Sequence, residues 1–229
     1  MPLSTCNCEG CELKTLFFEN ASTLEIEAIC TQKIEKSYKK GDVIIREGEF
    51  IREFIYLKEG LVKLYRVGND SKEQIICFAG PLDFVSLLSI FSEQHYNYSV
   101  SALEDTVTCN LLLSEIRQMA EKNGKFALSL IEKVNKASDK IILTFLDVKQ
   151  RRLYGRIAYI LLYFAEIICK SDIFELPVSR KEIAEFIGMT TENVIRTLSE
   201  FRKDRIIKIS GKTIEISDKE KLRRISEHS

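Results

Sequence analysis

The 229-residue sequence lacks any run of about 18 uninterrupted apolar residues, so no segment is expected to cross a membrane. Its first residues lack a basic stretch followed by an apolar core and a cleavage site, and no export signal is expected. It has no excess of either charge, with 34 Lys and Arg against 34 Asp and Glu, which excludes a uniformly basic nucleic-acid-binding coat. We expect a cytoplasmic protein with any DNA-binding surface confined to one region.

Signatures of catalysis are also missing. The two histidines, His95 and His228, have no nucleophile or carboxylate partner at a recognisable spacing. The motifs G-x-S-x-G and G-x-x-x-x-G-K-[ST] are absent. We therefore do not expect an enzyme. Binding to duplex DNA distinguishes the two classes, because an enzyme should bind duplex DNA no better than a neutral protein does.

Short β-rich runs fill residues 38–113, after a stretch at 22–34 that is typical of a helix. Glycines at intervals separate the runs, and many short strands at such spacing indicate an antiparallel sandwich or barrel. The runs lie at 43–45, 54–57, 61–65, 74–78, 98–102 and 106–112.

Residues 125–149 contain neither Gly nor Pro and predict one long helix. Apolar or small residues recur along it in steps that alternate between four and three, which is the spacing of a heptad seam. Such a helix is about 37 Å long, too long for one face of a small domain, so we predict a homodimer; the alternative is a helix packed on its own barrel. The predicted seam contains Ala127, Ile131, Val134, Ser138, Ile141, Phe145 and Val148.

A helix-turn-helix pattern follows an apolar helix at 156–168. Ser179 and Glu182 have the spacing of a capping box, Gly188 ends the first helix, and Thr190 can cap a second helix over 191–203. A buried stripe on the second helix is expected at Val194, Leu198 and Phe201. Residues 206–209 and 213–216, joined by a turn at 210–212, predict a two-stranded wing.

The outward face of the second helix has the chemistry of base reading. An arginine fork can bond guanine, a glutamate can accept from cytosine, and flanking cations can contact phosphates. The alternative is a small packing subdomain with a solvated charged face. The candidate DNA-contacting residues are Ser179, Arg180, Thr190, Thr191, Glu192, Ile195, Arg196, Ser199, Lys203 and Lys212.

These segments, in this order, resemble the CRP/FNR regulators over nearly the whole chain. The β-roll resemblance rests on runs such as Tyr38–Asp42, Glu47–Glu49 and Gly80–Phe84, and the helix-turn-helix resemblance on SRKEIAEFIGMTTENVIRTLSEF from Ser179. The resemblance implies an α+β fold with a cyclic-nucleotide-binding-type β-roll (jelly roll), a long dimerisation helix and a winged helix-turn-helix. We expect these domains at 21–124, 125–150 and 151–229, after a cysteine-containing segment at 1–20.

The same resemblance implies a transcription regulator that binds a palindromic promoter site as a dimer, and that contacts RNA polymerase if it is an activator. Glu192 and Arg196 match the glutamate and arginine of the family's recognition helix. Ile195 stands where FNR has a serine; it cannot form a hydrogen bond but can touch a thymine methyl group. A β-roll adaptor that binds a ligand and no DNA is the competing interpretation, and it would need none of these residues.

Nucleotide-binding members of the family hold the ribose and cyclic phosphate with a Gly-Glu pair and a later Arg-Ser/Thr pair. Here the first pair aligns with Ser86 and Leu87, and the second falls near residues 96–99, which contain no arginine. A buried phosphate would lack its charge-assisted partner. We therefore expect no binding of cyclic AMP.

The FNR branch holds an iron–sulfur cluster with three N-terminal cysteines and one in the β-roll. Cys6, Cys8 and Cys11 precede the β-roll, and Cys109 matches the fourth position. Four thiolates are what a cluster requires, but the spacing here is tighter than in FNR. The three interpretations are an iron–sulfur cluster, a zinc site on the same thiolates, and a tail of unliganded cysteines. The other three cysteines, Cys30, Cys77 and Cys169, have apolar surroundings typical of core positions.

Overall fold

A computed structural model describes residues 20–22, 25–27, 33–69, 71–81, 83, 85–86 and 88–228. The chain divides into two compact units. The first comprises Met1–Arg66 and Cys77–Ile141, and the second comprises Val67–Ile76 and Ile142–Ser229. No described helix is long and apolar enough to cross a membrane.

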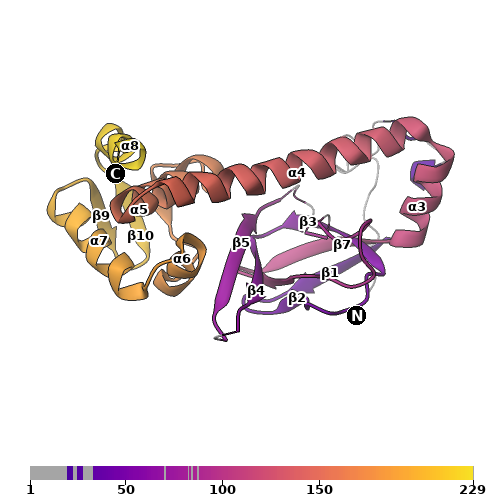
Figure 1. The fold of residues 1–229 in the computed structure, drawn as a ribbon, viewed down its shortest axis with the longest axis horizontal. Coiled ribbons are helices and arrows are strands. Elements are labelled where there is room, and N and C mark those ends of the chain that lie inside the picture. The colour runs from indigo at the N-terminus through magenta and orange to yellow at the C-terminus, as the bar shows by residue number, and fades with distance from the viewer. Residues whose placement is uncertain are drawn as a thin grey trace. The chain divides into compact units, whose positions relative to one another are not determined.

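Two antiparallel sheets form the β-roll (Figure 1). One has the strand order β1-β7-β3 and the other β2-β6-β4-β5. Large apolar side chains from both sheets are buried, among them Phe54, Leu57 and Ile45. The strands are β1 (Ile34–Tyr38), β2 (Val43–Ile45), β3 (Glu53–Glu59), β4 (Val62–Val67), β5 (Glu73–Ala79), β6 (Ser99–Ala102) and β7 (Thr106–Leu112).

The six predicted strands are confirmed, and the structure adds β1, which the sequence did not reveal. Residues 25–27 are helical, but the helix predicted to reach residue 34 is wrong at that end, because Ile34 already pairs with Asn110 of β7. A close approach at the β3–β4 turn explains Gly60: its φ is 95°, and a Cβ there would lie 2.5 Å from the Thr106 hydroxyl oxygen.

Helices α3 (Leu113–Lys122) and α4 (Gly124–Gln150) follow the roll, and α4 confirms the predicted long helix. Near its start α4 is anchored by the buried side chains of Phe126 and Leu130. Other large apolar side chains of α4 are exposed, a point that bears on the predicted dimer.

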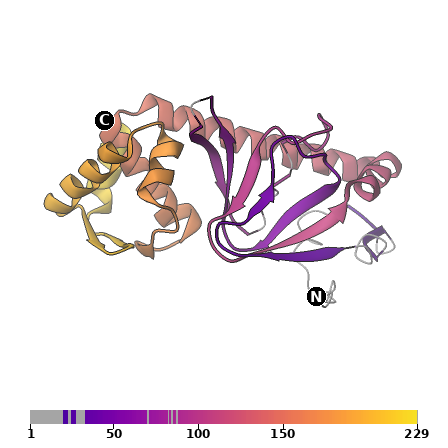
Figure 2. The ribbon, with the colours of Figure 1, turned by 90° about the horizontal axis from the view of Figure 1, so that it is seen from below.

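The second unit carries the predicted helix-turn-helix. Figure 2 shows its helices and the wing from below. Its sheet has three strands, in the order β8-β10-β9, so the predicted two-stranded wing is extended by β8. Its elements are α5 (Leu153–Tyr163), a π-helical turn η2 (Phe164–Ile168), β8 (Ile173–Glu175), α6 (Arg180–Ile187), α7 (Thr191–Lys203), β9 (Ile207–Ser210), β10 (Thr213–Ile216) and α8 (Lys219–His228).

Candidate nucleic-acid interface

The first helix of the motif, α6, begins and ends as its sequence predicts. The Ser179 hydroxyl accepts a bond from the Glu182 N–H at 3.1 Å, and the Glu182 carboxylate accepts one from the Ser179 N–H at 2.8 Å. At the other end Gly188 adopts the left-handed conformation, with φ 67° and ψ 48°. These two caps fix where the turn into α7 begins.

The second helix, α7, is capped by Thr190, whose hydroxyl accepts a bond from the Asn193 N–H at 3.3 Å. The pKa of Glu192 is lowered, first because its carboxylate accepts a bond from its own backbone N–H and second because it bonds the Thr190 hydroxyl. The carboxylate is therefore ionised near neutral pH and can only accept hydrogen bonds.

The inner face of α7 is buried, as expected from Val194, Leu198 and Phe201. A second contact holds the helix from outside, where the hydroxyl of Tyr154, on α5, donates to the Glu200 carboxylate. The ring of Tyr154 also lies 6.0 Å from that of Phe201. These contacts fix the rotation of α7 about its axis, and so decide which side chains face outward.

The structure places most of the candidate DNA-contacting residues on the surface of the second unit. Arg180 and Thr191 are half-buried, and burial lowers the pKa of the Arg180 guanidinium. The Lys212 side chain lies in the β9–β10 turn, at the tip of the wing. The exposed candidates are Ser179, Thr190, Glu192, Ile195, Arg196, Ser199, Lys203 and Lys212.

Asn193 is a functional candidate that the sequence reasoning missed. Its side-chain oxygen accepts a bond from Arg196 Nη2 at 3.1 Å. The amide is neutral, so it orients the guanidinium without cancelling its charge. Residues three apart on a helix are neighbours, and this spacing is the signal that could have identified the pair.

The outer face of α4 bears on the predicted dimer. Ile131 and Phe145 of the predicted seam are exposed, at 55% and 57%, whereas Val148 is buried within its own chain at 6%. Val134, Ser138 and Ile141 are half-buried. The large apolar side chains of α4 that are exposed are Leu128, Ile131, Ile142, Leu143, Phe145 and Leu146.

Cys109 is the described member of the predicted thiolate set; Cys6, Cys8 and Cys11 lie outside the described residues. It is 1% exposed on β7, directly between Glu35 of β1 and Tyr56 of β3. Glu35 pairs with Lys58 at 3.0 Å, so a charged group adjoins the thiol. Among the residues that the structure describes, no group of three His, Cys, Asp or Glu side chains is arranged to hold a metal ion.

Ser86 lies at the position of the family's nucleotide-binding Gly-Glu pair, and its side chain bonds the backbone of the roll. Its hydroxyl accepts a bond from the Ile55 N–H at 2.9 Å, and the residue is fully buried. Nearby, the Tyr98 hydroxyl donates to the Val85 carbonyl at 3.0 Å. Both hydroxyls are thus bonded to the roll's own backbone.

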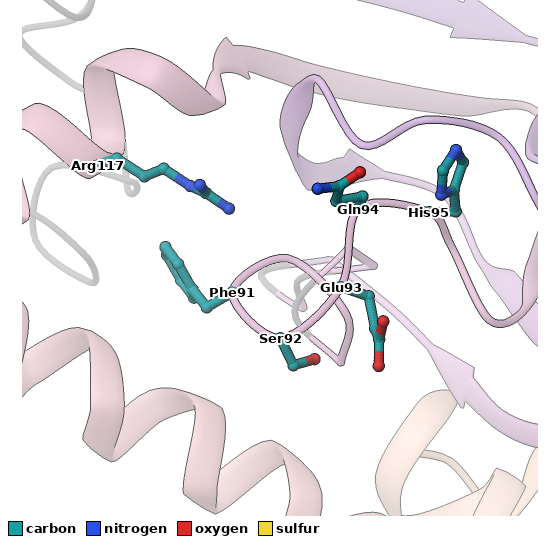
Figure 3. A pocket seen from close by; sticks show the side chains of 6 residues that line it. All are labelled: Phe91, Ser92, Glu93, Gln94, His95 and Arg117. Atoms are coloured by element: carbon teal, nitrogen blue, oxygen red, sulfur yellow. The ribbon is translucent and has the colours of Figure 1, made fainter.

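A hollow of about 550 Å³ opens elsewhere on the first unit. Figure 3 shows Phe91, Gln94 and Arg117 pointing into it. Arg117 also donates to the Ile90 carbonyl at 3.2 Å. None of the predicted site residues lines this hollow, so it is separate from the sites derived from the sequence.

Comparison with known proteins agrees with both halves of this description. Residues 35–123 match the family model of the cyclic nucleotide-binding domain, and residues 155–225 match that of the Crp-like helix-turn-helix domain. The chain is 25% identical to electron transport regulator A of Shewanella oneidensis, covering 94% of this chain and 88% of that protein. It is also 25% identical to the fumarate and nitrate reduction regulatory protein of Vibrio cholerae, covering 92% and 86%.

Solved structures show the same fold. FixK2 from Bradyrhizobium japonicum superposes with a TM-score of 0.76 at 24% identity, covering 84% of this chain and 96% of that one. A transcriptional regulator of the CRP/FNR family from Eubacterium rectale superposes with a TM-score of 0.78 at 18% identity, covering 92% and 97%. On the two domain matches, the relatives and the fold together, the chain belongs to the CRP/FNR family of regulators.

Proposed function

We propose that the protein is a transcription regulator that binds a palindromic promoter site as a homodimer, with α7 in the major groove. The observation that carries this is the outward face of a doubly capped helix-turn-helix, on which Glu192 is ionised and Arg196 is oriented by a neutral amide. Arg196 pairs with a guanine, Glu192 accepts from a cytosine, and Lys212 contacts a phosphate. Contact with RNA polymerase belongs to this proposal if the regulator is an activator.

The test is selection of the full chain against a random duplex library. Enrichment of a sequence with two inverted half-sites about one helical turn apart supports the proposal. Binding that is equally strong to every duplex, or no binding at all, overturns it.

We infer the dimer contact from the exposed stripe of α4. Leu128, Ile131, Ile142 and Phe145 fit steps of three and four, with Asn135 and Ser138 at the two intervening positions. This seam shares Ile131, Ser138 and Phe145 with the predicted one. Its other three positions lie one residue later in the chain, at Leu128, Asn135 and Ile142. An Asn at a seam position specifies the register of a coiled coil, so Asn135 favours one alignment of two parallel helices.

As the sensed signal we propose redox state or oxygen, through an iron–sulfur cluster held by Cys109 and the thiolates of Cys6, Cys8 and Cys11. The number and type of donors fit such a cluster. When bound, the cluster supplies a group that oxygen destroys. Cys109 provides a buried anchor on β7, so the cluster would tie the N-terminal segment to the roll.

Purification without oxygen tests this proposal. Iron and acid-labile sulfide in the wild type, lost on exposure to air and reduced in Cys109→Ser, are the expected results. Cys169→Ser is the matched control, because Cys169 lies in the second unit and its loss should leave the iron content unchanged. Zinc that survives air supports the structural alternative.

A second candidate function is a regulator whose β-roll binds a small molecule and no metal. The hollow beside Phe91 and Arg117 favours it, since it offers an aromatic and a cationic side chain to one ligand. Metal-free protein with full DNA affinity in air would favour this function over a cluster-dependent one.

A further inference from the structure

A pocket of about 300 Å³ lies in the second unit and is lined by residues of α5, η2 and α8. It contains none of the candidate DNA-contacting residues and none of the residues around the hollow of the first unit. Sites for small molecules are mostly lined by apolar and aromatic side chains, and this volume is near the lower end of their range. The pocket therefore has room for a molecule of one or two rings.

The π-helical turn η2 contributes an isoleucine to this pocket. The turn is wider than an α-helical turn, and such turns occur frequently at functional sites. Phe164, at its start, is fully buried in the core, whereas Ile167 lines the pocket and is exposed. The turn thus gives the pocket an apolar side chain that the core of the unit does not use.

Aromatic side chains of α5 complete the apolar wall of the pocket. The rings of Tyr159 and Tyr163, one helical turn apart, stack with their centroids 6.4 Å apart and their planes inclined by 26°. Leu162 of the same helix also lines the pocket. A further aromatic ring gains by packing offset or edge-on against such a pair. The wall therefore favours an aromatic ligand over an aliphatic one.

Both guanidiniums that line the pocket are committed to other groups. Arg223 Nη2 donates to the Glu166 carboxylate at 2.8 Å, and Arg151 Nε donates to the Ser226 carbonyl at 2.8 Å. Glu227 also lines the pocket, but it is exposed to solvent, where an ion pair gains little. A charged ligand would lose its hydration without gaining a new partner, so the pocket favours an uncharged one.

We propose that this pocket binds a small, planar, uncharged aromatic molecule. The wide turn at Ile167, the stacked tyrosines and the paired charges each favour such a ligand. The proposal gives the DNA-binding unit a ligand site of its own, separate from any in the β-roll. It does not depend on the proposed function, because binding of the ligand is measured without DNA.

Indole is the probe, because it is a planar two-ring molecule without charge. Indole-3-acetate is its anionic counterpart and tryptamine its cationic one. Ligand-observed NMR titration of the full chain is expected to show saturable binding of indole, with both charged counterparts about tenfold weaker. No saturable binding of indole at millimolar concentration overturns the inference, as does a charged counterpart that binds as tightly as indole.

The variant Ile167→Ser removes part of the apolar wall at an exposed position, so the fold should be retained. It is expected to weaken indole binding about tenfold, the effect of uncovering about two buried carbons. Ile173→Ser is the matched control, because Ile173 is an exposed isoleucine of the same unit that lies on β8, outside the pocket. It should bind indole as the wild type does. Equal indole affinity of Ile167→Ser and the wild type would overturn the assignment to this pocket.

Discussion

Arg156 joins α5 to the end of α6, where its Nη1 donates to the Ile187 carbonyl at 3.0 Å. Its Nε donates to the carbonyl of Arg151 at 2.8 Å. Carbonyls in the last turn of a helix have no partner within the helix, and a cation there is favoured by the helix dipole. One guanidinium therefore holds the turn of the helix-turn-helix against α5.

Replacing this guanidinium should loosen the motif. Arg156→Met leaves the Ile187 carbonyl without its charged partner, and we expect the free energy of unfolding of the second unit to fall by about 1–3 kcal/mol. Urea denaturation monitored by hydrogen exchange in α6 and α7 measures it. Arg66→Met, which breaks the exposed pair with Glu47 in the first unit, is the control and should change stability by less than about 0.5 kcal/mol. An unchanged urea midpoint for Arg156→Met would contradict the assignment.

The proposed dimer seam predicts that a carboxylate placed in the seam of α4 breaks the dimer, whereas one placed outside the seam does not. Ile142→Asp buries an unpaired charge in the seam, costs several kcal/mol and should give a monomer by analytical ultracentrifugation at micromolar concentration. Lys136→Asp introduces the same carboxylate away from the seam and should remain a dimer. A monomeric wild type, or a dimeric Ile142→Asp, would show that the stripe has another partner.

Ser86 should matter for stability rather than for ligand binding. Ser86→Ala leaves the buried Ile55 N–H without an acceptor, and a loss of about 1–3 kcal/mol is expected in thermal or urea unfolding. Ser92→Ala, at the rim of the hollow, is the comparison and should have little effect. Equal stability of Ser86→Ala and the wild type would mean that another group satisfies this N–H.

Cyclic AMP and cyclic GMP should not bind to the roll. The hydroxyls of Ser86 and Tyr98 serve the backbone, and no arginine stands at 96–99 to pair with a phosphate. Calorimetric titration of the full chain is expected to give no binding heat. A dissociation constant in the micromolar range or tighter would refute this prediction.

Replacing Arg196 should change the base specificity of binding, whereas replacing Lys212 should change the affinity for every duplex. Arg196→Ala is expected to cost about 1–3 kcal/mol on the selected site and to relax specificity at one position, because it removes a base contact. Lys212→Ala should weaken all duplexes alike and lower the salt slope by about one per protomer, because it removes a phosphate contact. Equal losses for Arg196→Ala on selected and random duplexes would remove it from base reading.

The parts of the fold that local chemistry determines could be predicted from the sequence. The capping box at Ser179 and the left-handed Gly188 are properties of a few adjacent residues, and both have the expected geometry. Strand β1 could not be predicted in this way, because its residues IEKSY are mostly polar and its strand state comes from pairing with β7. Helix α8 was missed for a similar reason: it is strongly charged, and its buried Leu222 and Ser226 gain an environment only from the rest of the second unit.

The candidate site shows the same division. The exposed face of α7 follows from helical periodicity, so Glu192 and Arg196 were predictable. For Arg196 and Asn193 the sequence gives only the spacing of three, and the bond itself depends on a side-chain conformation. On α4 the heptad spacing fits two seams that share Ile131, Ser138 and Phe145. The burial of Val148 within the chain and the exposure of Leu128 and Ile142 favour the second seam.

The π-helical turn η2 holds one residue more than a regular α-helix would hold over the same path. There the Cys169 N–H reaches back five residues to the Phe164 carbonyl, at 2.8 Å, so the turn contains one residue more than an α-helical turn. Phe164 and Ala165 remain buried, while Ile167 is 51% exposed. The wider turn thus places Ile167 on the solvent side while Phe164 and Ala165 stay in the core. In related chains this is where we expect a single-residue gap in sequence alignments, with a regular α-helix in the shorter members.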